Sequence, residues 1–295
     1  MERYTLPEYK DVSSAREVVV IGGGPAGLQT AITLARVHRS VLLVDSGQPR
    51  NAPAAHMHNF LTHDGTDPSE FRRAARAEVE ALPDARVLDD EVVRLDRDGD
   101  GFLAHTAAGR VVRSRTVLLA TGMRDRLPDV PGLAELFGRL VHHCPFCHGH
   151  ELAGGRVGVL DSPKAAHLTA ILTPIAAEVV LLEDVRGVSE QDGRAVAELG
   201  DGTTSTFDGI FTPTDLAPSA PFAEHLGLDL NPSGAVAVDV LGRTSAPGVF
   251  AAGDGAHHPD LPTPMASVLA AAATGQIAAG SCVAELVAPQ AAALS

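Results

Sequence analysis

Residues 17–45 constrain the fold more than any other part of the chain. The apolar residues 17–21 are typical of a short buried strand, and a glycine-rich turn at residues 22–27 follows directly. Residues 28–37 then have helical composition, and the apolar residues 41–44 predict a second strand that ends at Asp45. A strand, turn, helix and strand in this order predict the first unit of a doubly wound α/β domain.

The glycines of this turn have the spacing of a phosphate-binding loop. Gly22 permits a tight turn, Gly24 lets the backbone approach a pyrophosphate, and Gly27 lets the helix pack closely on the strand. The helix then offers free N–H groups to phosphate oxygens. Asp45, at the end of the next strand, is suited to a ribose hydroxyl. The pattern is weak evidence alone, but in this context it predicts a bound dinucleotide.

A second unit of the same kind occurs later in the chain. Residues 156–160 predict a strand, residues 165–172 a helix and residues 178–182 another strand. We therefore expect an α/β protein with two Rossmann-like three-layer domains. The other predicted elements are helices at 68–82 and 265–287, strands at 85–104, 111–119, 235–240 and 248–252, and a hairpin followed by a strand at 193–211.

Near the C-terminus, residues 247–254 have the sequence PGVFAAGD. A strand here runs into Gly253-Asp254, and a helix follows. Asp254 therefore lies at a turn, where its carboxylate can accept hydrogen bonds from a polyol or lie beside a pyrophosphate. Together with residues 22–27, this turn predicts an FAD site built from both ends of the chain.

Two of the three cysteines, Cys144 and Cys147, form a C-x-x-C pair within residues 142–150, HHCPFCHGH. A thiolate at the start of a helix, beside imidazoles, has a lowered pKa, and C-x-x-C closes easily to a disulfide. Zinc is the alternative, because both cysteines and two of the four histidines would make a Cys2His2 set. Structural zinc sites usually take two ligands from a distant segment. We therefore favour a redox pair and expect no metal.

Composition excludes several classes of protein. The 295 residues include 23 Lys and Arg against 37 Asp and Glu, and the formal net charge of −14 argues against nucleic-acid and anionic-membrane partners. We expect no membrane-spanning helix, and the polar residues 1–16 predict no signal peptide. Cys282 lies in an alanine-rich segment and is expected to be a buried small hydrophobe. These features together suggest a cytoplasmic protein.

The motifs also occur in the order and approximate spacing of a known family. GGGPAG at residues 22–27, ATG at 120–122, C-x-x-C and PGVFAAGD resemble the low-molecular-weight thioredoxin reductases over almost the whole chain. The resemblance implies a discontinuous FAD-binding domain, residues 1–122 and 241–295. It also implies an inserted domain, residues 123–240, that carries the cysteines, and a homodimer.

The resemblance further implies which residues bind FAD. Within it, His58 and Asn59 belong to a loop expected to approach the flavin, and Cys147 is expected to lie against the flavin ring. The implied FAD-binding residues are Gly22, Gly24, Pro25, Ala26, Gly27, Asp45, Gln48, Arg50, His58, Asn59, Val92, Thr121, Gly122, Gly253, Asp254, Met265 and Ala266.

The chain departs from that family where the reductases bind NADPH. The strand at residues 156–160 runs into Asp161-Ser162-Pro163-Lys164, without the three glycines of a phosphate loop. Pro163 has no N–H to donate, and Asp161 places a negative charge where a pyrophosphate would lie. Glu183 and Asp184 follow the next strand, where a 2′-phosphate needs basic residues. We therefore expect no functional NADPH site.

The cysteine motif departs as well, because His148 replaces the carboxylate that follows the second cysteine in the reductases. CPFCHGHE resembles the FAD-dependent dithiol oxidases that close disulfides of the gliotoxin and holomycin type. The resemblance implies that a small-molecule dithiol substrate attacks the Cys144–Cys147 disulfide at Cys144, that Cys147 passes electrons to FAD, and that oxygen becomes hydrogen peroxide. His143 and His148 are the candidate general bases, since an imidazole titrates near neutral pH.

Two other functions stay open from the sequence. One is a thioredoxin-type disulfide reductase that uses NADPH or a protein electron donor. The other is a zinc-binding flavoprotein without enzymatic activity. His142 and His150 are expected to be structural or solvent-facing.

Overall fold

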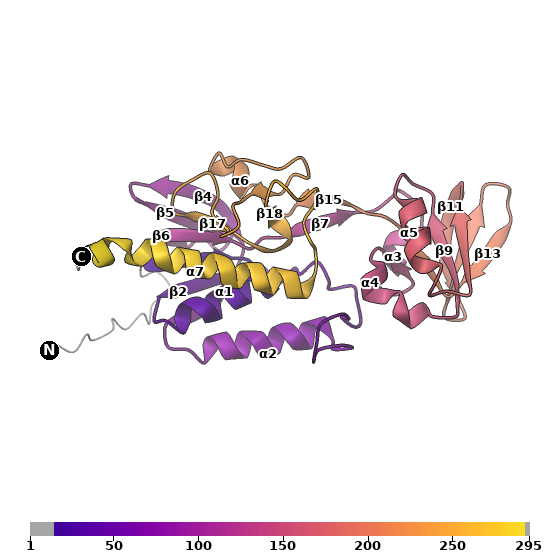
Figure 1. Cartoon of the computed structure of the whole chain (residues 1–295), viewed down its shortest axis with the longest axis horizontal. Coiled ribbons are helices and arrows are strands. Elements are labelled where there is room, and N and C mark those ends of the chain that lie inside the picture. The colour runs from indigo at the N-terminus through magenta and orange to yellow at the C-terminus, as the bar shows by residue number, and fades with distance from the viewer. Residues whose placement is uncertain (1–14, 293–295) are drawn as a thin grey trace. The chain divides into compact units, whose positions relative to one another are not determined.

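The computed structural model describes residues 15–292, and their contacts divide the chain into two compact units (Figure 1). Unit 1 comprises the described residues up to Pro49, Arg72–Arg124 and the residues from Ala217 onward. Unit 2 comprises Arg50–Phe71 and Asp125–Leu216. The expectation of no signal peptide concerns a segment that lies almost wholly outside the described residues.

Unit 1 is built on a seven-stranded sheet in which β3, β2, β1 and β6 are parallel neighbours. Strand β17 pairs parallel with β6, and β4 and β5 extend the other edge as an antiparallel meander. The strands are β1 (Arg16–Ile21), β2 (Val41–Asp45), β3 (Ala85–Asp89), β4 (Val92–Asp98), β5 (Gly101–Thr106), β6 (Val111–Leu119) and β17 (Val249–Ala251). Because the parallel strands share one direction, the turns after β1, β2, β6 and β17 meet at one sheet edge.

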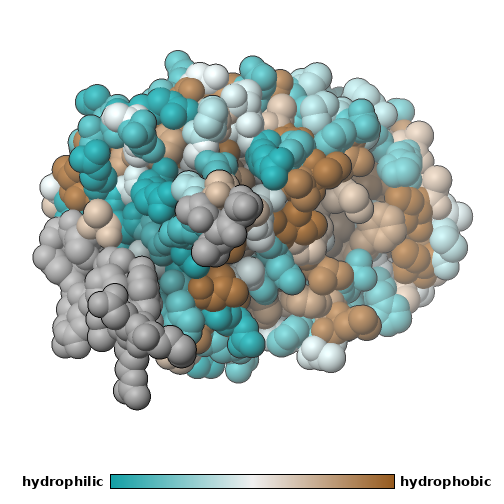
Figure 2. All heavy atoms as spheres, turned by 60° about the vertical axis from the view of Figure 1, so that its left-hand side comes forward, coloured by the Kyte–Doolittle hydropathy of each residue, from teal (hydrophilic) through white to brown (hydrophobic). Residues whose placement is uncertain are grey.

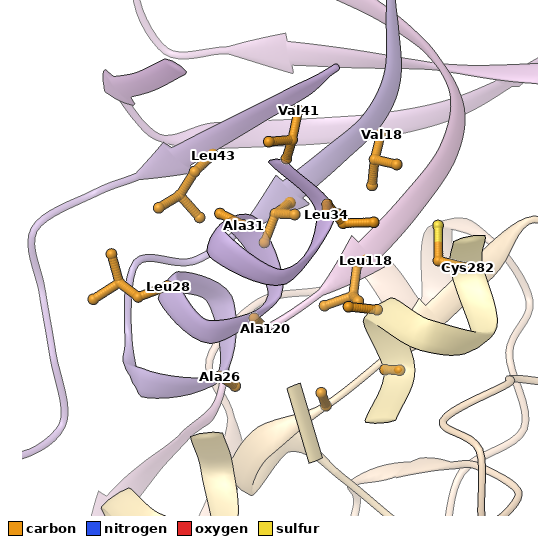
Figure 3. Packing of buried hydrophobic residues seen from close by; sticks show 14 of the residues in the cluster. Val18, Ala26, Leu28, Ala31, Leu34, Val41, Leu43, Leu118, Ala120 and Cys282 are labelled. Carbon is orange, nitrogen blue, oxygen red and sulfur yellow. The ribbon is translucent and has the colours of Figure 1, made fainter. Parts of the chain in front are cut away.

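Both faces of this sheet are buried. Val18, Leu43 and Leu118 pack on one face with helix α1 (Pro25–Ala35), as Figure 3 shows. The long helix α7 (Val268–Ala292) joins the same core through Cys282, which is fully buried, as predicted. On the other face, alternate residues of β1 and β2 pack against Phe102 of β5 and against residues 220–238. The apolar runs of these strands follow from burial on both sides.

Helices α1 and α7 lie side by side at very short range. The Thr30 hydroxyl donates to the Gly275 carbonyl oxygen at 3.1 Å, and a Cβ on Gly275 would lie 2.3 Å from the Ala26 carbonyl oxygen. By its length and its mean hydropathy of 1.2, α7 is apolar enough to cross a membrane, whereas the sequence predicted no such helix. One face of α7 packs on α1, β6 and β17, and 33% of its most apolar stretch is buried. The face in Figure 2 mixes hydrophilic and hydrophobic residues.

Unit 2 repeats the strand–helix–strand arrangement on a smaller scale. Its parallel sheet has the order β10-β9-β14-β8, and a separate antiparallel sheet has the order β11-β12-β13. The strands are β8 (Val141–His142), β9 (Arg156–Leu160), β10 (Glu178–Leu182), β11 (Val185–Gln191), β12 (Arg194–Leu199), β13 (Thr204–Phe207) and β14 (Gly209–Phe211). The helices are α3 (Leu133–Leu136), α4 (Pro145–His148), α5 (Ala165–Leu172) and the 3-10 turn η1 (His150–Leu152).

The remaining elements complete the chain. Strands β7 (Met123–Arg126) and β15 (Asp215–Pro218) pair with each other where the chain passes between the units. Helix α2 (Pro68–Glu80) follows the loop at residues 50–67. Helix α6 (Phe222–His225), strand β16 (Val236–Ala237), the 3-10 turn η2 (Gly253–Gly255) and strand β18 (Ala256–His257) belong to unit 1.

The units differ from the predicted domain boundaries in two places. Residues 217–240, predicted in the inserted domain, belong to unit 1, because Phe222 and Val236 are buried in its core. Residues 50–71, predicted in the FAD-binding domain, belong to unit 2, where Arg50 pairs with Asp125. Side chains far apart in sequence decide both assignments.

Candidate active site

The turn between β1 and α1 has the backbone geometry of a phosphate-binding loop. Gly22 has φ of +109°, and a Cβ there would lie 2.3 Å from the Ala120 carbonyl oxygen. A Cβ on Gly27 would lie 1.8 Å from the Gly22 carbonyl oxygen, so helix and turn touch. A Cβ on Gly24 would meet no protein atom within 4 Å. Packing therefore requires glycine at positions 22 and 27, and Gly24 faces open space that a ligand can approach.

Three further turns meet this loop at the same sheet edge. Asp45, at the end of β2, accepts a hydrogen bond from the Gly23 N–H at 3.0 Å. Leu119 at the end of β6 is in register with Ala251 of β17, so Thr121-Gly122 lies beside Gly253-Asp254. A Cβ on Gly255 would lie 3.1 Å from the Gly122 carbonyl oxygen. The first turn of α1 has no acidic residue that would repel a phosphate. These residues fit a dinucleotide.

The other implied FAD-binding residues are divided between the units. Gln48, Val92, Met265 and Ala266 belong to unit 1, with Val92 buried and Met265 exposed. Arg50, His58 and Asn59 belong to unit 2, where their recorded contacts are with residues of the same unit. Their role toward a flavin stays a prediction.

The equivalent turn of unit 2, after β9, forms hydrogen bonds within itself. After β9, the Ala165 N–H donates to the Ser162 carbonyl oxygen at 3.0 Å, and the Lys164 N–H lies 3.2 Å from Ser162 Oγ. The Lys164 ammonium lies 3.4 Å from the Thr214 carbonyl oxygen and 3.5 Å from Asp215. After β10, Arg186 pairs with Asp184 at 3.0 Å. The cations of this region are thus engaged by oxygen atoms of the chain itself.

Cys144 caps the short helix α4, and Cys147 lies within it. Both are thiols and both are half-buried. A hydrogen bond from Cys147, backbone N–H groups of Cys147 and Phe146, and the charge of Arg50 outweigh burial and lower the pKa of Cys144 to about 7. Pro145 begins the helix, and the Cys147 and His148 N–H groups donate to the Cys144 carbonyl oxygen at 3.2 Å. Cys144 is therefore a thiol that ionises near neutral pH.

Arg50 is held beside the cysteines by two residues distant in sequence. Its guanidinium donates twice to Asp125, each at 2.7 Å, and Thr214 also donates to Asp125 at 2.7 Å. Burial raises the pKa of Asp125, but these hydrogen bonds and the Arg50 charge lower it by more than burial raises it, so the net shift of the pKa is downward. His143 Nε2 lies 3.4 Å from Arg50 and its ring stacks on Phe137. Burial and Arg50 lower the pKa of His143 to about 4.

His148 belongs to a second group of side chains. Its ring stacks on His142, with ring centroids 4.3 Å apart, and meets the edge of His58 at 6.2 Å. Burial lowers the pKa of His148, the neighbouring His58 lowers it further, and Glu151 opposes both. His142 is buried, and burial with its imidazole neighbours lowers its pKa to about 3. His150 is exposed.

Sequence reasoning missed four residues of this region. Asp125, Thr214 and Phe137 belong to no motif and reach the site only through the strands and turns around it. Glu151 ends the CPFCHGHE motif and follows His148 by three residues, and these two local signals could have indicated it. Among the residues described here, no group of three or more His, Cys, Asp or Glu is arranged to hold a metal ion.

Known proteins resemble this chain in sequence and in structure. The sequence matches the family "Pyridine nucleotide-disulphide oxidoreductase" over residues 16–159 and 153–275. The thioredoxin reductase tcpT of Claviceps purpurea is 32% identical over 312 residues, covering 93% of this chain and 96% of that protein. The crystal structure of HlmI has a TM-score of 0.85 and 34% identity, covering 95% of each chain.

A third comparison concerns the fold alone. The putative thioredoxin reductase TrxB of Bacillus anthracis has a TM-score of 0.86 at 24% identity, covering 93% of this chain and 99% of that chain. The predicted α/β fold of the low-molecular-weight thioredoxin reductases is confirmed.

Proposed function

The chain belongs to the pyridine nucleotide-disulphide oxidoreductase family, and within that family we propose that it is an FAD-dependent dithiol oxidase. In this proposal the Cys144–Cys147 pair closes a disulfide within a small-molecule dithiol. Dioxygen is the final electron acceptor and becomes hydrogen peroxide.

One observation carries the proposal: the cysteine pair is intact whereas the second dinucleotide turn is not. Asp161 and Pro163 stand where phosphate-binding N–H groups are needed, and Lys164 is engaged by Thr214 and Asp215. In the proposed function the chain takes its electrons from the thiol substrate and not from a nicotinamide. CPFCH, the sequence at residues 144–148, resembles the motif of dithiol oxidases and supports this direction of electron flow.

The residues at the edge of the unit 1 sheet fit FAD. The open backbone at Gly24 and the start of α1 would receive its pyrophosphate, and Asp45 would receive its ribose. Bound there, FAD would supply a two-electron acceptor that dioxygen can reoxidise.

The exchange at the cysteines balances in sulfur, electrons and protons. A first substrate thiol loses its proton to a base, and its thiolate attacks Cys144 Sγ of the oxidised pair. The Cys144–Cys147 bond breaks, and Cys147 leaves as a thiolate. The second substrate thiolate attacks the substrate sulfur of the mixed disulfide, and Cys144 leaves as a thiolate. Two electrons pass from substrate to cysteines, and two protons pass to the base.

The histidines and Cys144 suit these steps. A pKa of about 7 makes Cys144 a good leaving group at neutral pH, because a more acidic thiol leaves faster. The lowered pKa values of His143 and His148 keep both imidazoles neutral and able to accept a proton. His143 is engaged by Arg50 and Phe137. We therefore assign the base to His148.

The alternative function is a thioredoxin-type disulfide reductase. The similarity to tcpT, which is named a thioredoxin reductase, supports this alternative. Turnover in air separates the two. The proposal expects purified protein to consume dioxygen with a small dithiol and to form equimolar disulfide and hydrogen peroxide. Reduction of a thioredoxin disulfide with NADPH, and no peroxide from the dithiol, would favour the reductase.

A further inference from the structure

The oxidase chemistry sets a problem for His148, since one half-buried imidazole, whose Nδ1 is shielded from solvent, must accept a proton twice per turnover. Each substrate thiol has to ionise before it attacks, and the first proton must leave His148 before the second thiol can use it. The lowered pKa of His148 means that this side chain holds an accepted proton only weakly. A path from His148 to solvent would meet that requirement.

Resting on the proposed function, we propose that His58 and Glu151 form a proton relay that carries thiol protons from His148 to solvent. The His58 ring meets the His148 ring edge-on, with centroids 6.2 Å apart and planes at 79°. On its other side, His58 Nδ1 lies 3.4 Å from Glu151 Oε1 and 3.4 Å from Asp64 Oδ1. His58 thus lies between the half-buried base and two carboxylates.

Exposure rises along this series of side chains. His148 and His58 are half-buried, with the His58 side chain 16% exposed, whereas Glu151 is 37% and Asp64 69% exposed. The two carboxylates are therefore the points where a proton reaches water. The local backbone structure positions both Glu151 and Asp64. Glu151 lies in η1, directly after α4, and Asp64 accepts a hydrogen bond from the Asn59 N–H at 2.9 Å.

The charges around the relay favour one direction. His142 stacks on His148, His56 meets the edge of His58, and His143 and the Arg50 cation lie by the cysteines, so no carboxylate lies on that side of the base among these neighbours. The hydrogen bond from the Asn59 N–H lowers the pKa of Asp64, and His58 and then His150 lower it further. Glu151 is the group that raises the pKa of His148 against burial and His58. A proton leaving His148 is therefore drawn toward Glu151 and Asp64.

Three buried ring nitrogens are available for such a relay. Among the described residues, Nδ1 of His58, of His142 and of His148 form no hydrogen bond, so His58 Nδ1 lies at ion-pair distance from Glu151 and Asp64 without being hydrogen-bonded to either. A buried polar atom without a partner costs free energy, and a catalytic role is one explanation for such an atom. Stacked, unpaired imidazoles are what a group that binds and releases protons needs.

The test compares Glu151→Gln with Glu190→Gln, a matched control whose carboxylate pairs with Arg139 instead. FAD-loaded protein is mixed without oxygen with dithiothreitol, and the rate of flavin bleaching is followed from about pH 6 to pH 9. We expect Glu151→Gln to slow bleaching about 10-fold at neutral pH. The loss should shrink toward alkaline pH, where the substrate thiols ionise unaided. His58→Ala should be slow too, and added imidazole should restore part of its rate.

A second readout needs no turnover. Histidine ring resonances are followed by NMR against pH in the reduced protein, with His148→Gln identifying the signal. Glu151→Gln should move the His148 titration to lower pH, and Glu190→Gln should leave it in place. An unchanged His148 titration, or a rate loss equal at every pH, would overturn the relay. A moved titration in a protein whose flavin no dithiol reduces would support the relay residues and overturn the oxidase function.

Discussion

Two strand–turn–helix–strand segments of this molecule share a topology and differ in what their turns can bind. In β1-α1-β2, a Cβ on Gly22 or Gly27 would lie less than 3 Å from a backbone atom, so both positions require glycine. A Cβ on Gly24 would meet no protein atom within 4 Å. In β9-α5-β10, the turn contains Asp161 and Pro163, and its hydrogen bonds are internal. The apolar strands alone suffice to build the topology. Ligand binding depends on a few turn residues, and these can be lost without losing the fold.

In the proposed function, the cysteine pair lets unit 2 act without a nicotinamide. Cys144→Ser and Cys147→Ser should each reduce dithiol turnover to background, because one thiol cannot form the internal disulfide. Flavin absorbance of the purified variants should equal that of the wild type. Cys282→Ser is the control, since Cys282 is buried against Thr116 and burial raises its pKa to about 12. Turnover in either active-site variant would contradict the assignment.

The same substitution in the two turns compares them directly. Gly24→Asp should abolish flavin binding, because it adds a negative charge and a side chain to open space in front of the pyrophosphate. Ser162→Asp, in the turn of unit 2, should leave flavin content and dithiol turnover within about twofold of the wild type, because the proposed function places no ligand at that turn. Flavin absorbance per protein measures the first effect. Equal flavin loss in both variants would remove the distinction between the turns.

Arg50 should tune the acidity of Cys144. Arg50→Met removes a positive charge that lowers the pKa of Cys144, so the pH at which this thiol ionises should rise by about half to one unit. Alkylation of reduced protein by iodoacetamide, with Cys144 identified by peptide mass, measures that midpoint. Arg139→Met is the control, because Arg139 pairs with Glu190. A midpoint that stays near pH 7 in Arg50→Met would show that Arg50 has no electrostatic role.

The smallest expected effect is on stability. Asp125 has a folded pKa below its unfolded value, so its contribution is present above about pH 4 and is lost as pH falls through the folded pKa. Asp125→Asn leaves Arg50 without its carboxylate and should lower the free energy of unfolding by about 1–3 kcal/mol at pH 7. The deficit should narrow toward pH 3. Urea unfolding at both pH values measures it, and an unchanged deficit would assign the loss to packing.

The sequence predicted elements well where the apolar pattern was continuous. Strands β9 and β10 and helix α5 have the predicted bounds, because each is a short apolar run between polar turns. Strand β11 was not predicted, since VRGVSEQ has few apolar residues and pairs with β12 in an exposed sheet. The strand expected at 235–240 is only Val236–Ala237. Helix α7 continues past the predicted end at residue 287 and includes Pro289.

The candidate site was predictable only as far as its motifs extend. Cys144, Cys147 and the glycine turn carry local patterns whose chemistry depends on spacing. The Asp125 partner of Arg50 lies 75 residues away, and no periodicity connects them. The contact of His58 with Glu151 likewise joins a loop to a 3-10 turn that the chain brings together only on folding.

Anaerobic reduction of the bound flavin tests the central claim most directly. The purified protein, free of oxygen, is mixed in separate samples with NADPH, NADH and dithiothreitol, and flavin absorbance is followed before air is admitted. The account predicts rapid bleaching by the dithiol, no useful rate with either nicotinamide, and recovery of colour with hydrogen peroxide in air. Rapid bleaching by NADPH, with a flavin that the dithiol leaves oxidised, would contradict it.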